Sequence, residues 1–169
     1  MKASKLTIRE TVLFAVLGAL TFALKMCMAL LPNIEPVSLL VMVFAAVFGL
    51  KALYPTYVYV TMEVLYWGIG TWNLNYLYIW AVLALAALLL RKSEQPLAWA
   101  LLSGVYGLAF GALCAPVDVA VGGLSFAVTK WASGIPFDIA HCVGNFAIAL
   151  VLFKPLRTLL DKLYARMQR

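Results

Sequence analysis

Uninterrupted apolar runs are the feature that most limits what this chain can fold into. The segment Val37–Leu50 has one hydroxyl and no charge, and Tyr76–Leu90 has no charge. A hydrocarbon core of about 30 Å takes roughly 20 helical residues to cross, and a helix satisfies its own backbone groups there. With 65% hydrophobic and 12% charged residues, the chain has about half the charged fraction of a soluble domain. We therefore predict an all-α protein in which residues 1–169 form a single integral membrane domain.

These runs, and the residues that interrupt them, predict a six-span transmembrane helical bundle. The first run is expected to be a retained span, because a secretory signal has a shorter apolar core and a small-residue cleavage site. The second is short, so we expect it to be tilted or partly shielded from lipid. A longer connection at 117–133 precedes the last span. The expected spans are Thr11–Leu31, Val37–Leu50, Pro55–Gly68, Tyr76–Leu90, Pro96–Cys114 and Pro136–Phe153.

The lysines and arginines predict an orientation for this bundle. Eleven of the 13 basic residues lie before span one, between spans two and three, between spans four and five, or after span six. Cytoplasmic loops are enriched in Lys and Arg, so both termini are expected in the cytoplasm. The net charge of +6 then reflects topology and does not indicate nucleic-acid binding. The tail Leu156–Arg169 is expected to be a short amphipathic helix on the inner membrane surface.

The last span carries polar side chains on one face. Asp138, His141 and Asn145 are spaced i, i+3 and i+7, which brings an acid, an imidazole and an amide to the same side of a helix. Polar groups are expensive in lipid, so they usually face a binding site or one another. Asp138 closely follows Pro136 and is also a candidate helix cap, favoured by the helix dipole. For His141 and Asn145 the alternative is an interhelical hydrogen bond.

A carboxylate surrounded by aromatic residues is expected on one face of span three. Such a carboxylate accepts hydrogen bonds from an N–H-rich heterocycle or pairs with a cation, while the rings stack on the ligand. The alternatives are a structural ion pair with Lys25 or Lys130, or a protonated acid bonded to a neighbouring helix. The residues of this face are Tyr59, Glu63, Tyr66 and Trp67.

Two loops on the predicted outer side add further candidates for the site. The loop after span three has two amides next to two aromatic rings, although Trp and Tyr are also typical of the membrane interface. The loop between spans one and two holds an acid between two prolines, which is either a gate residue or a solvated loop acid. The candidates are Trp72, Asn73, Asn75 and Tyr76 in the first of these loops, and Asn33 and Glu35 in the second.

No enzymatic activity is expected from this chain alone. Asp138, His141 and Cys142 are neighbours, but consecutive helical residues point to different faces, so Cys142 turns away from the face of His141. The single histidine and the three cysteines lack metal-ligand spacing, so no metal site is predicted and the cysteines are expected to pack as small hydrophobes. A Gly-x4-Gly-Lys-Ser/Thr motif is also absent, so a partner must supply any ATP that is used.

The first span carries a stripe of small residues. Ala15, Ala19 and Ala23 recur every fourth residue, which lets another helix approach closely, either a partner or a neighbour in the bundle. Together with the six spans, the short chain and the segments Leu31–Leu40 and Gly134–Phe146, this stripe resembles the substrate-binding S components of energy-coupling-factor (ECF) transporters. The resemblance covers essentially the whole chain.

The resemblance implies a function and a set of partners. An S component binds a vitamin or related micronutrient from outside, docks through its alanine stripe on a transmembrane scaffold subunit, and topples in the membrane to release the solute inside. Two cytoplasmic ATPase subunits use ATP and Mg, so no cofactor is expected in this chain. Loops after spans one, three and five close over the ligand. The resemblance thus implies a multi-pass subunit of an ABC-type importer in a prokaryotic plasma membrane.

The polar residues also limit the substrate. Glu63 and Asp138 argue against an anionic ligand, and the only basic candidates in the outer halves are Lys25 and Lys130. A neutral or cationic, N–H-rich ring is expected: a pyrimidine, a thiamin-like molecule or a deazaguanine precursor of queuosine. Cobalamin is an alternative, because His141 or a cysteine could ligate cobalt. A solitary small-solute transporter and an intramembrane enzyme are the remaining alternatives.

Overall fold

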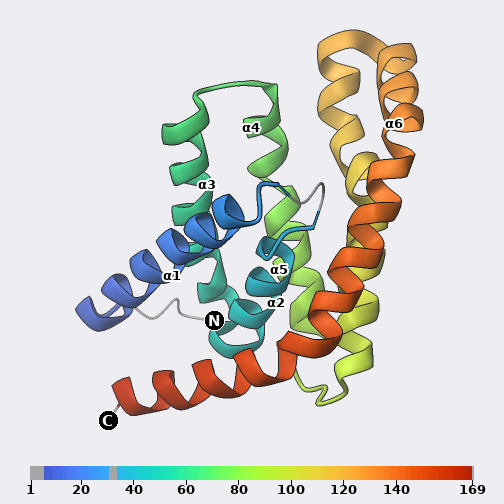
Figure 1. Ribbon diagram of the computed structural model, residues 1–169. Coiled ribbons are helices and arrows are strands. Elements are labelled where there is room, and N and C mark those ends of the chain that lie inside the picture. The colour runs from blue at the N-terminus through green and yellow to red at the C-terminus, as the bar shows by residue number, and fades with distance from the viewer. Residues whose placement is uncertain (1–5, 31–33, 169) are drawn as a thin grey trace.

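The computed structural model describes residues 6–30 and 34–168, and every regular element in these two ranges is a helix (Figure 1). The all-α prediction is therefore confirmed for this part of the chain. The elements in order are α1 (Ile8–Cys27), α2 (Val37–Phe48), the 3-10 turn η1 (Gly49–Ala52), α3 (Leu53–Trp67), α4 (Thr71–Tyr76), α5 (Ile79–Leu89) and α6 (Pro96–Met167).

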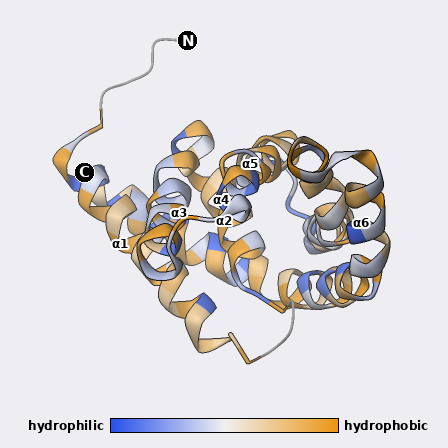
Figure 2. Ribbon diagram, turned by 90° about the horizontal axis from the view of Figure 1, so that it is seen from above, coloured by the Kyte–Doolittle hydropathy of each residue, from blue (hydrophilic) through white to orange (hydrophobic). Residues whose placement is uncertain are grey.

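Within the described residues, four helical stretches are long and apolar enough to cross a membrane. Hydrophobic residues cover much of the helix surfaces, and hydrophilic residues are confined to short patches (Figure 2). The chain therefore has the helices of a membrane protein, as its apolar runs predict. The four stretches are Ile8–Cys27, Val37–Trp67, Thr71–Leu89 and Pro96–Met167.

Helix α2 is the centre of the molecule. All twelve of its residues are buried, and it lies between α1 and α3 on one side and α6 on the other (Figure 2). Its sequence is apolar around its whole circumference except for Ser38, and a helix of that kind is stable only where every side is covered. The short span that was expected to be tilted or partly shielded is thus shielded by the other helices from Val37 to Phe48, and Leu50 at its end is 50% exposed.

Helix α6 is a hairpin of two helical arms. Only Gly123 departs from helical geometry inside it, with φ 81° and ψ 174°, and Figure 1 shows the chain folding back at the tip of this hairpin. This left-handed φ is readily adopted only by glycine, which has no Cβ. The predicted long connection at 117–133 is therefore wrong, since these residues extend the two arms. Pro116 and Pro136, expected to bound spans, lie inside the helix.

Glycines on the first arm of α6 allow the second arm to approach closely. A Cβ on Gly107 would lie 2.8 Å from the backbone carbon and oxygen of His141, and a Cβ on Gly111 would lie 2.4 Å from Oδ2 of Asp138. Both distances are shorter than van der Waals contact, so only glycine fits there without displacement. Two of the predicted polar residues of the second arm are therefore positioned by this glycine seam.

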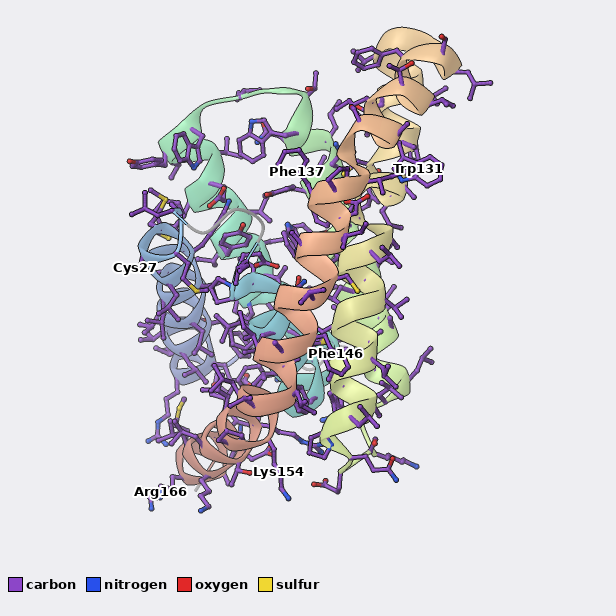
Figure 3. The ribbon with its side chains drawn as sticks, turned by 45° about the vertical axis from the view of Figure 1, so that its right-hand side comes forward. Cys27, Trp131, Phe137, Phe146, Lys154 and Arg166 are labelled. Carbon is purple, nitrogen blue, oxygen red and sulfur yellow. The ribbon has the colours of Figure 1, made fainter. Side chains whose placement is uncertain are left out.

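Basic side chains of distant segments gather at the end of the molecule opposite the tip of the α6 hairpin. Arg91 donates hydrogen bonds to carbonyl oxygens of the last turn of α2, and Arg157 donates one of 2.8 Å to the carbonyl of Ser93. Figure 3 labels Lys154 and Arg166 at the same end. Arg91 thus satisfies carbonyls that the end of α2 leaves without intrahelical partners, and Arg157 ties the connection between α5 and α6 to the C-terminal part of α6.

The C-terminal part of α6 crosses this basic end (Figure 1). It changes direction near Pro155. Proline has no backbone N–H to donate to the preceding turn, and its ring crowds the carbonyl there. Tyr164 in this part donates a hydrogen bond of 2.6 Å to Glu10 of α1, and Lys51 of η1 pairs with the same carboxylate at 2.6 Å. The predicted amphipathic tail is thus a helix held to the bundle up to Met167, and Arg169 lies outside the described residues.

Helix α1 packs on α3 through a face different from its alanine stripe. A Cβ on Gly18 would lie only 2.5 Å from the Cβ of Val58, so Gly18 marks the closest approach of the two helices. Ala15 and Ala23 are exposed and Ala19 is partly exposed. The alternative that the alanines serve packing within the bundle is therefore not supported by the described contacts.

The glycine seam predicts a stability difference between two Gly→Ala variants. Gly107→Ala forces a methyl group against the His141 backbone and is expected to cost about 1–3 kcal/mol. Gly134→Ala in the same helix places its methyl group in open space, so it serves as the control with the same gain in helix propensity. Thermal unfolding in detergent should give a lower midpoint for Gly107→Ala. Equal midpoints would contradict the close approach.

Candidate functional site

An inner cavity lies among α1, α3, α4, α5, α6 and the segment that precedes α2. Its volume is about 350 Å³, which is within the usual range of roughly 300–1,000 Å³ for small-molecule sites. Five aromatic side chains, one lysine, one glutamate and one histidine stand out in its lining. The lining residues are Lys25, Met26, Met28, Ala29, Ile34, Glu35, Tyr59, Trp67, Tyr76, Trp80, Phe110 and His141.

An ion pair between α1 and α3 borders the cavity. Lys25 Nζ lies 2.5 Å from Glu63 Oε2, and the Glu63 side chain is 2% exposed. The ammonium also lies 5.8 Å from the ring centroids of Tyr59 and Tyr76, within the range of a cation–π interaction. The expected alternative for Glu63, an ion pair with Lys25, is therefore present, and it places this pair beside the aromatic walls.

Glu35 links the N-terminal end of α2 to α6. Its carboxylate accepts hydrogen bonds from the backbone N–H groups of Val37 and Ser38, a bond of 2.6 Å from the Ser38 hydroxyl, and a 3.2 Å contact with Nε2 of His141. It therefore caps α2, where an acid is also favoured by the helix dipole. With a side chain 16% exposed, Glu35 is not the solvated loop acid that was one alternative. The other gate-loop candidate, Asn33, lies outside the described residues.

The electrostatic surroundings hold Glu35 in its ionised form. Burial by itself raises the pKa of this carboxyl, but the hydrogen bond and charge of His141, together with the Ser38 hydrogen bonds, outweigh burial and leave the pKa below its ordinary value. The cavity therefore presents a carboxylate that accepts hydrogen bonds at neutral pH.

Several polar atoms around the cavity have no hydrogen-bond partner among the described residues. Nε1 of Trp80 and the hydroxyl of Tyr59 belong to lining residues, and Oε1 of Glu63 belongs to the ion-pair partner of the lining residue Lys25. Both amide atoms of Asn145, one helical turn from His141, are also without partners in the described part of the chain. A buried polar atom without a partner costs about 1–3 kcal/mol, so native proteins seldom retain one without a reason. A bound molecule with both donors and acceptors would satisfy them.

Asp138 has a different role from the predicted helix cap. It lies well inside α6, because the helix starts far before Pro136. Oδ1 accepts a 3.1 Å hydrogen bond from the backbone N–H of Gly111 on the first arm, and Oδ2 has no partner among the described residues. His141 and Asn145 are also buried, so the three residues predicted on one face all point into the protein.

The aromatic residues of α3 are divided between the cavity and the surface. Tyr59 is fully buried and lines the cavity, and Trp67 also lines it although it is 59% exposed. Tyr66, equally exposed, packs edge-to-face against Phe22 of α1 with ring centroids 5.6 Å apart. Tyr66 thus lies outside the lining, although it shares a face with Glu63 in the sequence.

The four residues predicted in the loop after span three lie in helix α4. Asn73 accepts a 2.5 Å hydrogen bond from the backbone N–H of Gly70, and Asn75 accepts one of 3.1 Å from the Tyr78 hydroxyl. Asn73 therefore caps the helix and does not line the inner cavity. Tyr76 lines it, whereas Trp72 and Asn75 border a separate outer cavity.

Two aromatic side chains of the cavity wall were not predicted as site residues. Trp80 and Phe110 lie in apolar runs where nothing in the sequence separates a wall of the site from ordinary packing. Phe110 contacts His141 edge-to-face at 5.0 Å. Lys25 was predicted only as a basic candidate and as one of two alternative ion-pair partners of Glu63, and which lysine pairs depends on how α1 crosses α3. For Glu35 a signal exists, since an acid just before an apolar helix is a typical N-terminal cap.

The arrangement has the features of a small-molecule binding site. His141 contacts Glu35, while Sγ of Cys142 lies 3.6 Å from the Cβ position of Gly104, so the two side chains diverge. Among the described residues, no group of three or more His, Cys, Asp or Glu side chains could hold a metal ion. Aromatic walls with a few converging polar groups are the usual construction of a small-molecule site.

Comparison of the chain with known protein families, curated proteins and solved structures finds no match.

The capping role of Glu35 predicts a pH-dependent loss of stability. Because its folded-state pKa is depressed, its contribution is complete above the ordinary glutamate pKa of about 4.3 and is lost as the pH falls through the lower folded-state value. Glu35→Gln should cost about 1–3 kcal/mol at pH 7, and less in acid. The control is Glu94→Gln, since that side chain is 77% exposed. A penalty for Glu35→Gln that stays constant with pH would refute this assignment.

Proposed function

We propose that this protein is the substrate-binding S component of an ECF-type importer for a vitamin or related heterocyclic micronutrient. It would bind the solute outside a prokaryotic plasma membrane and deliver it to a transmembrane scaffold and two ATPase subunits. The observation that carries the proposal is the inner cavity, which combines a size suited to one or two rings, aromatic walls and buried polar atoms without partners.

The arrangement of the helices supports six crossings with both termini in the cytoplasm. In this topology α1, α2, α3, α5 and the two arms of α6 each cross once, and α4 lies at the outer surface. The basic end, with Arg91 and Arg157, then faces the cytoplasm as the positive-inside rule requires. The inner cavity and the tip of the α6 hairpin face outward, where an importer first meets its substrate.

The alanine stripe supports docking on a scaffold. Ala15, Ala19 and Ala23 lie away from the Gly18 contact with α3 and are at least partly exposed. Small residues on a membrane-exposed face permit a second helix to approach closely. Lys25 lies near the C-terminal end of the same helix, so the docking face and one cavity wall belong to one element.

The groups around the cavity favour a neutral or cationic substrate that is rich in N–H donors. Two carboxylates, Glu35 and Glu63, face one lysine and one histidine there. Oε1 of Glu63 is free to accept from a ligand N–H, and the Trp80 N–H is free to donate to a ligand acceptor. A ring edge with adjacent donors and acceptors, as in pyrimidines, aminopyrimidines and deazaguanines, matches both.

Cobalamin is less well supported. A corrin ring with its side chains is several times larger than a bicyclic heterocycle, and the cavity holds about 350 Å³. His141, the residue that would ligate cobalt, already contacts Glu35 at 3.2 Å. The two remaining alternatives need no ATPase subunits: a solitary transporter would transport without them, and an enzyme would turn over alone in detergent. Copurification of this chain with a scaffold and two ATPases would therefore favour the proposal over both.

Ligand retention tests the site. Protein purified from its own host is expected to show a bound small molecule by native mass spectrometry. Glu63→Gln should reduce the bound fraction at least tenfold, because the amide lacks the charge that pairs with Lys25 and accepts ligand N–H groups. Thr61→Val on the same helix is the control, since the Thr61 hydroxyl bonds only within its own helix at Tyr57. Equal retention by both variants would remove Glu63 from the site.

Uptake by a docking variant tests the partners. Ala19→Trp should leave ligand retention intact but abolish uptake and copurification with a scaffold and two ATPases, because the indole prevents close helix approach. Val82→Trp on α5 places the same side chain at another exposed position and should behave as wild type. Wild-type uptake by Ala19→Trp would contradict docking through the stripe.

A further inference from the structure

A second cavity lies on the outer side of the site, between α4 and the two arms of α6. Its volume is about 380 Å³, similar to that of the inner cavity. The two cavities share Tyr76 and Phe110 in their walls, so these two side chains form the partition between them. The lining residues are Trp72, Asn75, Tyr76, Phe110, Gly111, Cys114, Asp118, Lys130, Trp131 and Gly134.

Aromatic rings from three helical segments surround this outer cavity. Trp72 and Tyr76 come from α4, Phe110 from the first arm of α6 and Trp131 from the second arm, where Figure 3 shows it on the side of the molecule opposite Cys27. Trp and Tyr faces carry negative electrostatic potential and attract organic cations. The walls therefore favour a cation of moderate size.

An acid without a charged partner lies next to the outer cavity. Among the lining residues, Asp118 and Lys130 form an ion pair of 2.5 Å that neutralises both. Asp138, which adjoins the lining residue Gly111, is 7% exposed, and its Oδ2 has no hydrogen-bond partner among the described residues. A carboxylate oxygen in this position lacks the compensation that a buried charge requires.

The unpartnered oxygen of Asp138 lies next to Gly111, a lining residue of this cavity. The position of a Cβ on Gly111, which lines the cavity, lies 2.4 Å from Oδ2 of Asp138 and 3.0 Å from Cδ1 of Trp131. The free oxygen and the indole therefore converge beside Gly111. Only the absence of a side chain at this position leaves that space open.

We infer that the outer cavity is a second ligand subsite, which takes an organic cation between Trp72 and Trp131 with Asp138 as its counter-ion. The subsite itself follows from the cavity, the rings and the free carboxylate oxygen. Its extension to the substrate rests on the proposed function. The transported molecule would place an N–H-rich ring in the inner cavity and a covalently attached cationic group in the outer cavity, past Tyr76 and Phe110.

Cys114 provides a direct probe, because it lines the outer cavity and is partly exposed. The full chain with Cys27→Ser and Cys142→Ser is treated with one of two methanethiosulfonate reagents. The ethyltrimethylammonium reagent is cationic, and the ethylsulfonate reagent is anionic. Each reagent forms a mixed disulfide with the Cys114 thiolate and releases methanesulfinate. Intact-mass spectrometry follows the reaction, and each rate is divided by the rate of the same reagent with 2-mercaptoethanol.

The cationic reagent is expected to react at least tenfold faster than the anionic one after this correction. Asp138→Asn should reduce the preference at least threefold, and the control Asp161→Asn in the C-terminal part of α6 should not change it. A corrected ratio near one, or a ratio unchanged in Asp138→Asn, would overturn the inference.

If Asp138→Asn does not fold, a second experiment uses protein that keeps Asp138 and measures how far an added salt protects Cys114 from labelling. Benzyltrimethylammonium chloride should slow Cys114 labelling by the ethylsulfonate reagent at least threefold, whereas sodium benzenesulfonate at the same ionic strength should not. Equal effects of the two salts would also overturn the subsite. Copurification with ATPases does not enter either readout, so failure of the proposed function and failure of this inference are distinguishable.

Discussion

Buried carboxylates paired across helices are the interaction on which the rest of this structure depends. Glu10 is joined to Lys51 and Tyr164, Glu63 to Lys25, and Glu35 to His141. Breaking a buried pair by removal of one partner typically costs about 3–5 kcal/mol, so each pair fixes the relative position of two or more elements. The Glu10 cluster holds the C-terminal part of α6 to α1, and the other two pairs hold α1, α3, α2 and α6 around one cavity.

Some buried polar groups of the described residues lack partners beside these pairs and the inner cavity, and they include groups of Tyr59, Glu63 and Trp80. Within α2, and where Gly18 of α1 meets Val58 of α3, apolar side chains pack closely. Beside Lys25 and His141, by contrast, the Trp80 indole keeps an unused donor and Glu63 an unused acceptor. Such groups are conformationally fixed before any ligand arrives, and a preorganised site loses less entropy on binding.

Helix α1 connects two properties that the proposed function requires. Its inward face carries Gly18, which sets the distance to α3, and Lys25, which borders the cavity; its outward face carries Ala15 and Ala23. A substrate that competes with Lys25 for Glu63 would act directly on the helix that docks. Substrate binding and scaffold docking would then be coupled by a change in α1 alone, because the cavity and the alanine stripe both involve this helix. A longer chain of contacts would not be needed.

The sequence by itself determined the all-α character and the membrane class, because apolar runs of this length have few other stable solutions. It also identified Glu63, His141 and Asn145 as buried polar residues, because their spacing on apolar helices leaves them no route to water. Only the tertiary structure decided that Glu35 meets His141, that Tyr66 turns to α1, and that Asp138 is not a cap. These outcomes depend on contacts between segments far apart in sequence: the fold at Gly123, the glycine seam of α6 and the crossing of α1 over α3. Helical periodicity says which residues share a face, but the packing of the helices decides what that face meets.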